Sequence, residues 1–281
     1  MNKTYKKGLL GIYVAAFLIC IPCQLILKLR YIDPDTGFYN APAWLPTLLH
    51  AALLFAVLAW AWLTLLKRTQ NDYPVATPPA PAVHFFAILT GAALLAYNLF
   101  EMFPLLRIVD TATTERRQAL TAPIAATGLA LGVVAGLSLC LAGFFGLRKR
   151  RPVPLAGLHL FPAIWGALAL FSLFNRYKPL ITIPEYLFWV LFLVAANLFF
   201  MAHARVISGL GRQDGRNYII PAGLSASLLG FTLAVPAVVS RLFGAAPTAF
   251  APTAWQSAFI LLTSAYALAF TQHFIRSIRE V

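Results

Sequence analysis

Long apolar runs separated by short polar segments fill this sequence from end to end. Apolar runs of about 18 residues or more are typical of helices that cross a membrane, because roughly 20 residues of α-helix span the hydrocarbon core. We place eight such helices, at 8–29, 41–66, 83–108, 122–147, 155–175, 183–207, 218–241 and 252–275. The pattern predicts an all-α polytopic membrane protein. No polar segment is long enough for a soluble domain, so we expect residues 1–281 to form a single transmembrane domain.

The polar stretch between Arg30 and Pro42 has an outline that returns three more times. In each copy an Arg ends one apolar run, a polar turn follows, and a Pro opens the next run. The four copies are Arg30 to Pro42, Arg107 to Pro123, Arg176 to Pro184 and Arg241 to Pro252. We therefore expect four helical hairpins whose turns share one side of the membrane. Two explanations remain open: ordinary helix punctuation by Pro and Arg, or a duplicated hairpin unit.

Composition and charge support the membrane interpretation and orient the chain. Hydrophobic residues make up 60% of the sequence and charged residues 11%, against about 25% charged in soluble domains. The net charge of +13 would suggest nucleic acid in a soluble protein, but 14 of the 22 Lys and Arg residues lie at the termini and in the loops opposite the Arg–Pro turns. The positive-inside rule then predicts cytoplasmic N- and C-termini in the cell membrane, and no nucleic-acid partner. If the chain has seven spanning helices and not eight, the C-terminus lies on the opposite side of the membrane.

A basic cluster falls in one of the loops that we expect to be cytoplasmic. It consists of Arg148, Lys149, Arg150 and Arg151. Basic residues beside a helix end bind anionic lipid headgroups, so we expect contact with such lipids here. A partner protein docked on the same face, or a second copy of the chain, is the alternative use of this surface.

Glu101 is the most informative ionisable residue, because it sits well inside the predicted helix 83–108. Asn98 lies one turn earlier on the same face. A carboxylate at such depth is costly unless it is paired or faces water, which makes it a candidate ligand or proton site. We group it with the four arginines that end the outward-running helices, Arg30, Arg107, Arg176 and Arg241. The competing interpretation is a structural ion pair between Glu101 and an outer Arg.

Three prolines precede these arginines and favour bends at the outer side. Pro22, Pro104 and Pro236 lie three to eight residues before Arg30, Arg107 and Arg241. A Pro inside a helix frees a carbonyl and bends the chain, although Pro also occurs in spanning helices without such a role. Bends at this depth predict an outward-facing vestibule lined by Arg and carboxylate groups.

Small residues indicate where two helices approach closely. Gly128, Gly132 and Gly136 repeat every four positions, and Cys140 continues the same face. Such a stripe predicts close packing of another helix, which we expect to belong to the same chain; a second copy is the alternative. Asn197, near the middle of its helix, is expected to make an interhelical hydrogen bond.

Helix caps are predicted at three starts. Thr182 and Glu185 fit a capping box, in which the Thr caps the helix and the Glu reaches back. Asn40 and Thr121 stand in the same position before Ala-Pro pairs, and a Pro in the first turn loses no helical hydrogen bond.

Motifs for metals, cofactors and covalent chemistry are weak or missing in the sequence. Cys20 and Cys23 form a Cys-x-x-Cys without the soluble βαβ context that a redox motif needs. The stretch after Asp33 has half of a calcium loop but lacks its final Glu. No two of the five histidines have the i, i+4 spacing of a helical metal site; they are His50, His84, His159, His203 and His273. We therefore predict no metal and no cofactor.

The sequence favours a non-enzymatic membrane protein that binds a small solute or lipid, as a transporter or permease component. This prediction depends on the expected vestibule, on Glu101 and on the repeated outline. The alternative is a sensor or assembly subunit that acts through a partner protein on the basic cytoplasmic face. An intramembrane enzyme is the third hypothesis, since Ser225 and His273 only faintly match a Ser–His pair.

Overall fold

The computed structural model is an all-α, multi-pass membrane protein. It describes residues 3–33, 35–66, 80–102, 118–148, 156–176, 183–208, 212–244, 248 and 251–277. In chain order the helices are α1 (Lys3–Ile26), the π-helical turn η1 (Leu27–Tyr31), α2 (Trp44–Leu66), α3 (Pro81–Tyr97), the π-helical turn η2 (Asn98–Met102), α5 (Gln118–Leu147), the 3₁₀ turn η3 (Ala156–Leu160), α6 (Phe161–Arg176), α7 (Pro184–Ser208), α8 (Arg212–Leu242) and α9 (Ala254–Ser277). Eight helices of this described part are long and apolar enough to cross a membrane.

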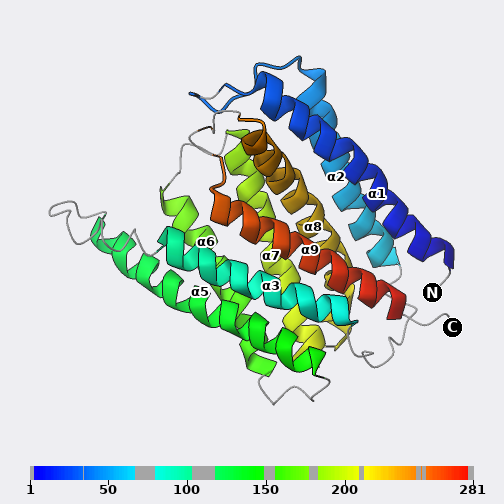
Figure 1. Cartoon of the computed structure of the whole chain (residues 1–281). Helices are drawn as coiled ribbons and strands as arrows, with labels where there is room; N and C mark the ends of the chain where they lie inside the picture. The colour runs from blue at the N-terminus through cyan, green and yellow to red at the C-terminus, as the bar shows by residue number, and fades with distance from the viewer. Residues whose placement is uncertain are drawn as a thin grey trace.

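The helices pack side by side, with α7, α8 and α9 at the centre of the bundle (Figure 1). On one side α1 and α2 pack against each other and against α8. On the other side α3 packs against α9 and α5, and α6 lies between α5 and α7. α1 begins and α9 ends at the same end of the bundle (Figure 1). This order places α7 and α8 where neighbouring helices cover most of their surface.

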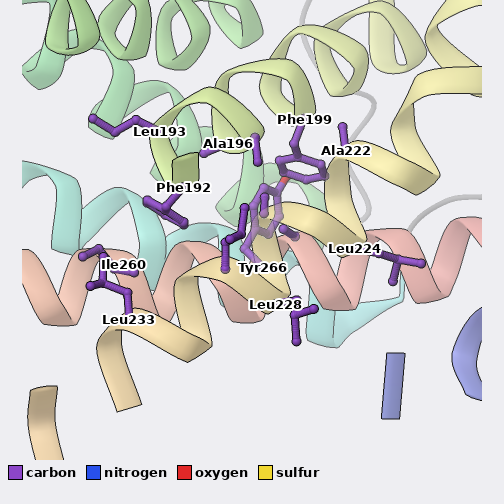
Figure 2. Packing of buried hydrophobic residues seen from close by; sticks show 14 of the residues in the cluster. Phe192, Leu193, Ala196, Phe199, Ala222, Leu224, Leu228, Leu233, Ile260 and Tyr266 are labelled. Atoms are coloured by element: carbon purple, nitrogen blue, oxygen red, sulfur yellow. The ribbon is translucent and has the colours of Figure 1, made fainter. Parts of the chain in front are cut away.

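Large apolar and aromatic side chains fill the interface of the three central helices. Phe192 and Phe199 of α7 are fully buried, and Tyr266 of α9 lies against Phe199 with ring centroids 5.9 Å apart (Figure 2). Apolar side chains also cover the outside of the bundle: Leu54 and Phe55 of α2 are more than 60% exposed. In water such a surface would favour association. In a bilayer it faces the lipid tails, as the apolar runs of the sequence predict.

Glycines leave room for side chains of a neighbouring helix where two helices pack closely. A Cβ at Gly132 of α5 would overlap the amide of Asn98, and one at Gly136 would lie 2.7 Å from Leu95. The stripe on α5 therefore packs against α3 and its continuation η2, within the same chain; Gly128, in the same stripe, is buried. The same arrangement joins α6 to α7, where Gly166 faces Asn197.

Asn197 uses this space to bond the backbone of α6. In the amide orientation that satisfies both groups, its nitrogen lies 2.6 Å from the carbonyl of Ala163 and its oxygen 2.9 Å from the N–H of Ala167. Interhelical hydrogen bonds of this kind join helices where no water is present.

Several helix starts differ from those expected. α2 begins at Trp44, so Asn40 and Pro42 lie in the preceding turn, and α5 begins at Gln118, which places Thr121 inside the helix. α9 begins after Thr253, whose hydroxyl accepts from the N–H of Gln256 while the Gln256 side chain accepts from the N–H of Thr253. This is a capping box that the sequence analysis missed. Local signals name plausible caps, but packing decides which turn of the helix is the first.

Candidate functional site

A buried ion pair joins two helices and an interhelical segment at one end of the bundle. Lys28 of η1 donates to one carboxylate oxygen of Glu185, in the first turn of α7. Thr248, between α8 and α9, donates its hydroxyl to the other oxygen. The exposed fractions of the Lys28 and Glu185 side chains are 6% and 1%. We call these three residues the Lys–Glu cluster.

The Glu185 carboxylate is well supplied with donors for a group so deeply buried. Each oxygen of Glu185 has a donor, and the positive charge of Lys28 is matched by the carboxylate. Removing two charges from water costs several kcal/mol per ion, and the attraction between them offsets this cost only when the geometry and the added hydrogen bonds are good. The Thr248 hydroxyl supplies one of those bonds, so the pair is held as a closed unit.

Lys28 reaches Glu185 from a π-helical turn. η1 continues α1 with i to i+5 hydrogen bonding, and a second π turn, η2, continues α3. Single π turns are rare and occur often at functional sites, because the wider turn redirects the side chains that follow it. Of the five residues of η1, Leu27 and Lys28 are buried. The wider turn thus accompanies the placement of a lysine inside the bundle.

Gln24 and Tyr39 form a second polar contact beside the ion pair. Gln24 is buried four positions before Lys28, and its amide nitrogen lies 2.8 Å from the Tyr39 hydroxyl oxygen. Burial raises the pKa of Tyr39, and the negative charge of Glu185 adds to the rise. The phenol therefore stays neutral and serves as a hydrogen-bonding group close to the carboxylate.

The turn between α1 and α2 holds Tyr39 in place through its own hydrogen bonds. An isolated antiparallel bridge pairs Ile32 with Tyr39. The carboxylate of Asp33 accepts from the Thr36 hydroxyl at 2.7 Å and from the N–H of Asp35 at 3.0 Å. These bonds, led by that of Thr36, lower the pKa of Asp33. Gly37 adopts a positive φ of 73°, which closes the turn at low steric cost.

The residues that the sequence analysis grouped as a ligand site have separate partners. Asn98 donates to the Leu94 carbonyl at 2.7 Å and accepts from the Trp165 indole N–H at 3.3 Å. Arg30 is exposed and lies over the ring of Tyr31, with 5.7 Å from its guanidinium carbon to the ring centroid. Arg241 donates to the Ser257 hydroxyl. Each of these three side chains therefore contacts a residue outside the group that the sequence analysis proposed.

The other members of that group are described only in part or not at all. Glu101 lies in η2 and Arg176 ends α6, but the structure describes the backbone of these two positions and not their side chains. Arg107 lies outside the described residues. Pro104 also lies outside them, so the expected bend there stays a prediction.

The sequence analysis missed Lys28 and Thr248 and assigned Glu185 only to a helix cap. Thr182, the partner in that expected capping box, lies outside the described residues. A signal for the pair was available, because Lys28 and Glu185 are opposite charges that lie inside two predicted spans. Charges inside a span are rare and tend to pair. The distance of 157 positions between them along the chain hid the partnership.

Other candidate chemistry is limited. Cys20 and Cys23 are buried free thiols. Within the described residues, no three His, Cys, Asp or Glu side chains lie close enough to hold a metal ion. In the basic loop, the Arg148 guanidinium stacks over Phe144 at 4.1 Å, and residues 149–151 lie outside the described residues.

Comparison with known proteins assigns no family to this chain. No family model matches it, and no curated protein or solved structure does. The function must therefore be argued from the site itself. The Lys–Glu cluster is the feature with the clearest physical meaning.

Proposed function

We propose that this protein is a non-enzymatic transporter or permease component of the cell membrane that binds a small charged solute or lipid. In this proposal the chain forms four hairpins, both termini are cytoplasmic, and the Lys–Glu cluster closes the outward side. The observation that carries the proposal is the buried pair of Lys28 and Glu185, completed by Thr248.

A buried ion pair can form a closure that also opens, because its net contribution to stability is small. Attraction between the two charges is nearly cancelled by the cost of dehydrating them, so a closed pair gains little over a separated, hydrated pair. Two states that differ by a few kcal/mol are both within reach of thermal motion and ligand binding. A solute with a charged group of its own would replace one partner and favour the open state. An apolar contact in the same place would give no such selectivity.

A solute screen tests the proposal directly. The protein in lipid nanodiscs is melted in the presence of amino acids, small carboxylates, amines and phosphorylated headgroups, and any solute that stabilises it is tested for uptake into proteoliposomes. We expect at least one class to raise the melting temperature. The shift should vanish in the double variant Lys28→Met with Glu185→Gln, which removes both charges and leaves no unpaired one. Glu101→Gln tests whether the vestibule expected around Glu101 contributes.

Failure of the screen has a defined meaning. If no class of solute shifts the melting temperature and none is taken up, the Lys–Glu cluster has a structural role only. The alternative, a sensor or assembly subunit that acts through a partner on the basic face, then becomes the better hypothesis.

Cysteine labelling of intact cells tests the orientation on which the proposal depends. In a variant lacking the three native cysteines, Thr36→Cys should react with an impermeant maleimide and Arg150→Cys should not. The reason is the excess of Lys and Arg expected on the cytoplasmic side. Reaction at position 150 from outside would reverse the orientation and place the Lys–Glu cluster on the cytoplasmic side.

A further inference from the structure

The Lys–Glu cluster sets a condition on the charge of any solute that separates it. In the closed pair the Glu185 carboxylate and the Lys28 ammonium neutralise each other, and these side chains are 1% and 6% exposed. A buried charge that loses its partner is strongly destabilising. A solute with one charge would match one partner and leave the other without a counter-charge. A solute that carries both charges leaves neither partner unmatched.

Lys28 still needs a counter-charge when the pair separates, because its side of the helix faces into the bundle. Gln24, one turn earlier on the same side, and Leu27 are both buried. The next two residues, Leu29 and Arg30, are exposed. The helix therefore directs Arg30 towards the outside and Lys28 towards Glu185.

The two helix ends give the cluster a fixed polarity. Glu185 lies in the first turn of α7, where the positive end of the helix dipole favours a negative charge. Lys28 lies in the last turn of η1, where the negative end of that helix favours a positive charge. We therefore expect the anionic group of a solute at Lys28 and its cationic group at Glu185.

Glu185 requires a hydrogen-bond donor as well as a positive charge. One of its oxygens accepts from Lys28 and the other from Thr248. When Lys28 is displaced, the first oxygen loses its bond, and a buried acceptor without a donor is costly. A primary ammonium has N–H donors, as lysine has, whereas a quaternary ammonium has none. The group that replaces Lys28 must therefore carry N–H groups.

A second donor for an anion lies beside Lys28. The Gln24 amide nitrogen is 2.8 Å from the Tyr39 hydroxyl oxygen. This amide carries two N–H groups, and the contact with Tyr39 uses one of them. Residues four positions apart are neighbours on a helix, so Lys28 and Gln24 can both donate to one anionic group. The turn that carries Tyr39 is exposed at Asp35 and Thr36, which places this end of the cluster close to the surface.

We infer that the Lys–Glu cluster binds a zwitterion in which a primary ammonium and an anionic group lie a few bonds apart. The inference rests on the proposed function and names the class of its substrate. In the bound state the ammonium donates to Glu185 in place of Lys28, and the anionic group accepts from Lys28 and Gln24. Amino acids and the phosphoethanolamine headgroup of a lipid share this chemistry. Binding leaves the total charge of the site unchanged.

A matched series of solutes tests the inference on the unaltered protein. Nanodiscs of phosphatidylcholine and phosphatidylglycerol are used, because these lipids carry no primary ammonium. The probes are glycine, β-alanine and γ-aminobutyrate, each compared with the carboxylate, the amine and the trimethylated amino acid of the same chain length. We expect at least one amino acid to raise the melting temperature and to bind at least about tenfold more tightly than its three analogues.

Two lysolipids distinguish the sources of the zwitterion. Lysophosphatidylethanolamine carries the primary ammonium, and lysophosphatidylcholine carries a quaternary one on the same phosphate. A preference of at least about tenfold for the first lipid, with no binding of the amino acids, supports the inference and assigns a lipid headgroup. Binding of the amino acids alone supports it and assigns a soluble substrate.

Variants assign the contacts. Lys28→Met with Glu185→Gln leaves no unpaired charge and should abolish binding of the zwitterion. Glu185→Gln alone should bind the simple carboxylate more tightly than the amino acid, because the positive charge of Lys28 remains. The matched control is Tyr13→Phe, which deletes a buried hydroxyl bonded to Ser227 outside the cluster and should leave binding unchanged.

Three results would overturn the inference. If a simple amine or carboxylate binds the unaltered protein as tightly as the amino acid, the substrate is not a zwitterion, while the proposed function stands. If the trimethylated analogue binds equally well, Glu185 does not receive a hydrogen bond from the ammonium. If no probe of either kind binds, the inference and the proposed function both fail.

Discussion

Two groups of buried polar side chains lie at opposite ends of α7: the Lys–Glu cluster, and a group formed by His159 of η3, His203 of α7 and Tyr266 of α9. They differ in how fully their hydrogen bonds are made. Around Glu185 both carboxylate oxygens have donors, and a lysine balances the charge. Around His203 one nitrogen of each imidazole has no partner in the protein. A further donor to the Glu185 carboxylate would have to compete with Lys28 or Thr248. A cluster with unbonded buried nitrogens can take a further hydrogen bond without losing one that it already makes.

Breaking the saturated cluster should have the largest effect. Lys28→Met leaves Glu185 charged and buried with Thr248 as its donor, and we expect the free energy of unfolding to fall by about 3–5 kcal/mol. Thermal unfolding of the purified protein measures the loss. Adding Glu185→Gln should recover most of it, because the unpaired charge is then gone. Equal melting of Lys28→Met and the unaltered protein would show that the pair is not buried in the membrane.

Removing the hydrogen bond between Tyr266 and His203 should lower the free energy of unfolding by a smaller amount. Tyr266→Phe deletes the hydroxyl bonded to His203, and we expect a loss of about 1 kcal/mol, the usual net value of one hydrogen bond. Tyr13→Phe is the matched control, because it deletes a buried tyrosine hydroxyl bonded to Ser227 at 2.8 Å, outside both clusters. Tyr266→Phe should cost about as much as Tyr13→Phe in the same melting assay, because each variant deletes one buried hydroxyl that makes one hydrogen bond. A much larger cost would mean that the bond between Tyr266 and His203 is stronger than an ordinary hydrogen bond and that the comparison fails.

The smallest expected effect is a change in alkaline stability at Tyr39. Burial raises the pKa of this phenol in the folded chain above its value in the unfolded chain. The stability that it contributes is therefore complete below about pH 10, the ordinary pKa of tyrosine, and declines as pH rises through the higher folded value. Tyr39→Phe should make the melting temperature fall less steeply between about pH 9 and pH 11. An identical slope in both proteins would mean that Tyr39 is open to water.

Much of the architecture follows from the sequence because it depends on local properties. The eight spans follow from the length and apolarity of the runs, and all eight lie close to the helices of the structure. The stripe of Gly132 and Gly136 predicted close helix packing because small residues have that effect at any depth. Helix starts were less accurate at α2 and α5, where no local rule chooses between successive turns.

The candidate sites were harder to predict because they depend on pairings between distant segments. Lys28, Glu185 and Thr248 come from three separate parts of the chain, and no spacing rule relates them. Glu101 and Asn98 suggested one site; Asn98 accepts from Trp165, and the Glu101 side chain is not among those that the structure describes, so that site stays a prediction. His159 and His203 were visible only as two histidines near helix ends. Their association is a product of the packing of η3 against α7.

The close contacts at glycines also determine which helices can slide along their neighbours. A side chain that lies against a glycine would clash with backbone if its helix moved along the neighbouring helix. Such contacts fix the register of three helix pairs, α3 with α5, α6 with α7, and α8 with α9. In the last pair Ser264 lies against Gly230. Among the described glycines of α1 there is no such contact, since nothing lies within 4 Å of a Cβ at Gly8 or Gly11. Among the described residues, no glycine contact therefore fixes the register of α1 against the rest of the bundle, and the plane between the α1–α2 pair and α8 holds the Tyr13–Ser227 hydrogen bond instead. A displacement along that plane would carry Lys28 away from Glu185 while the three helix pairs keep their registers.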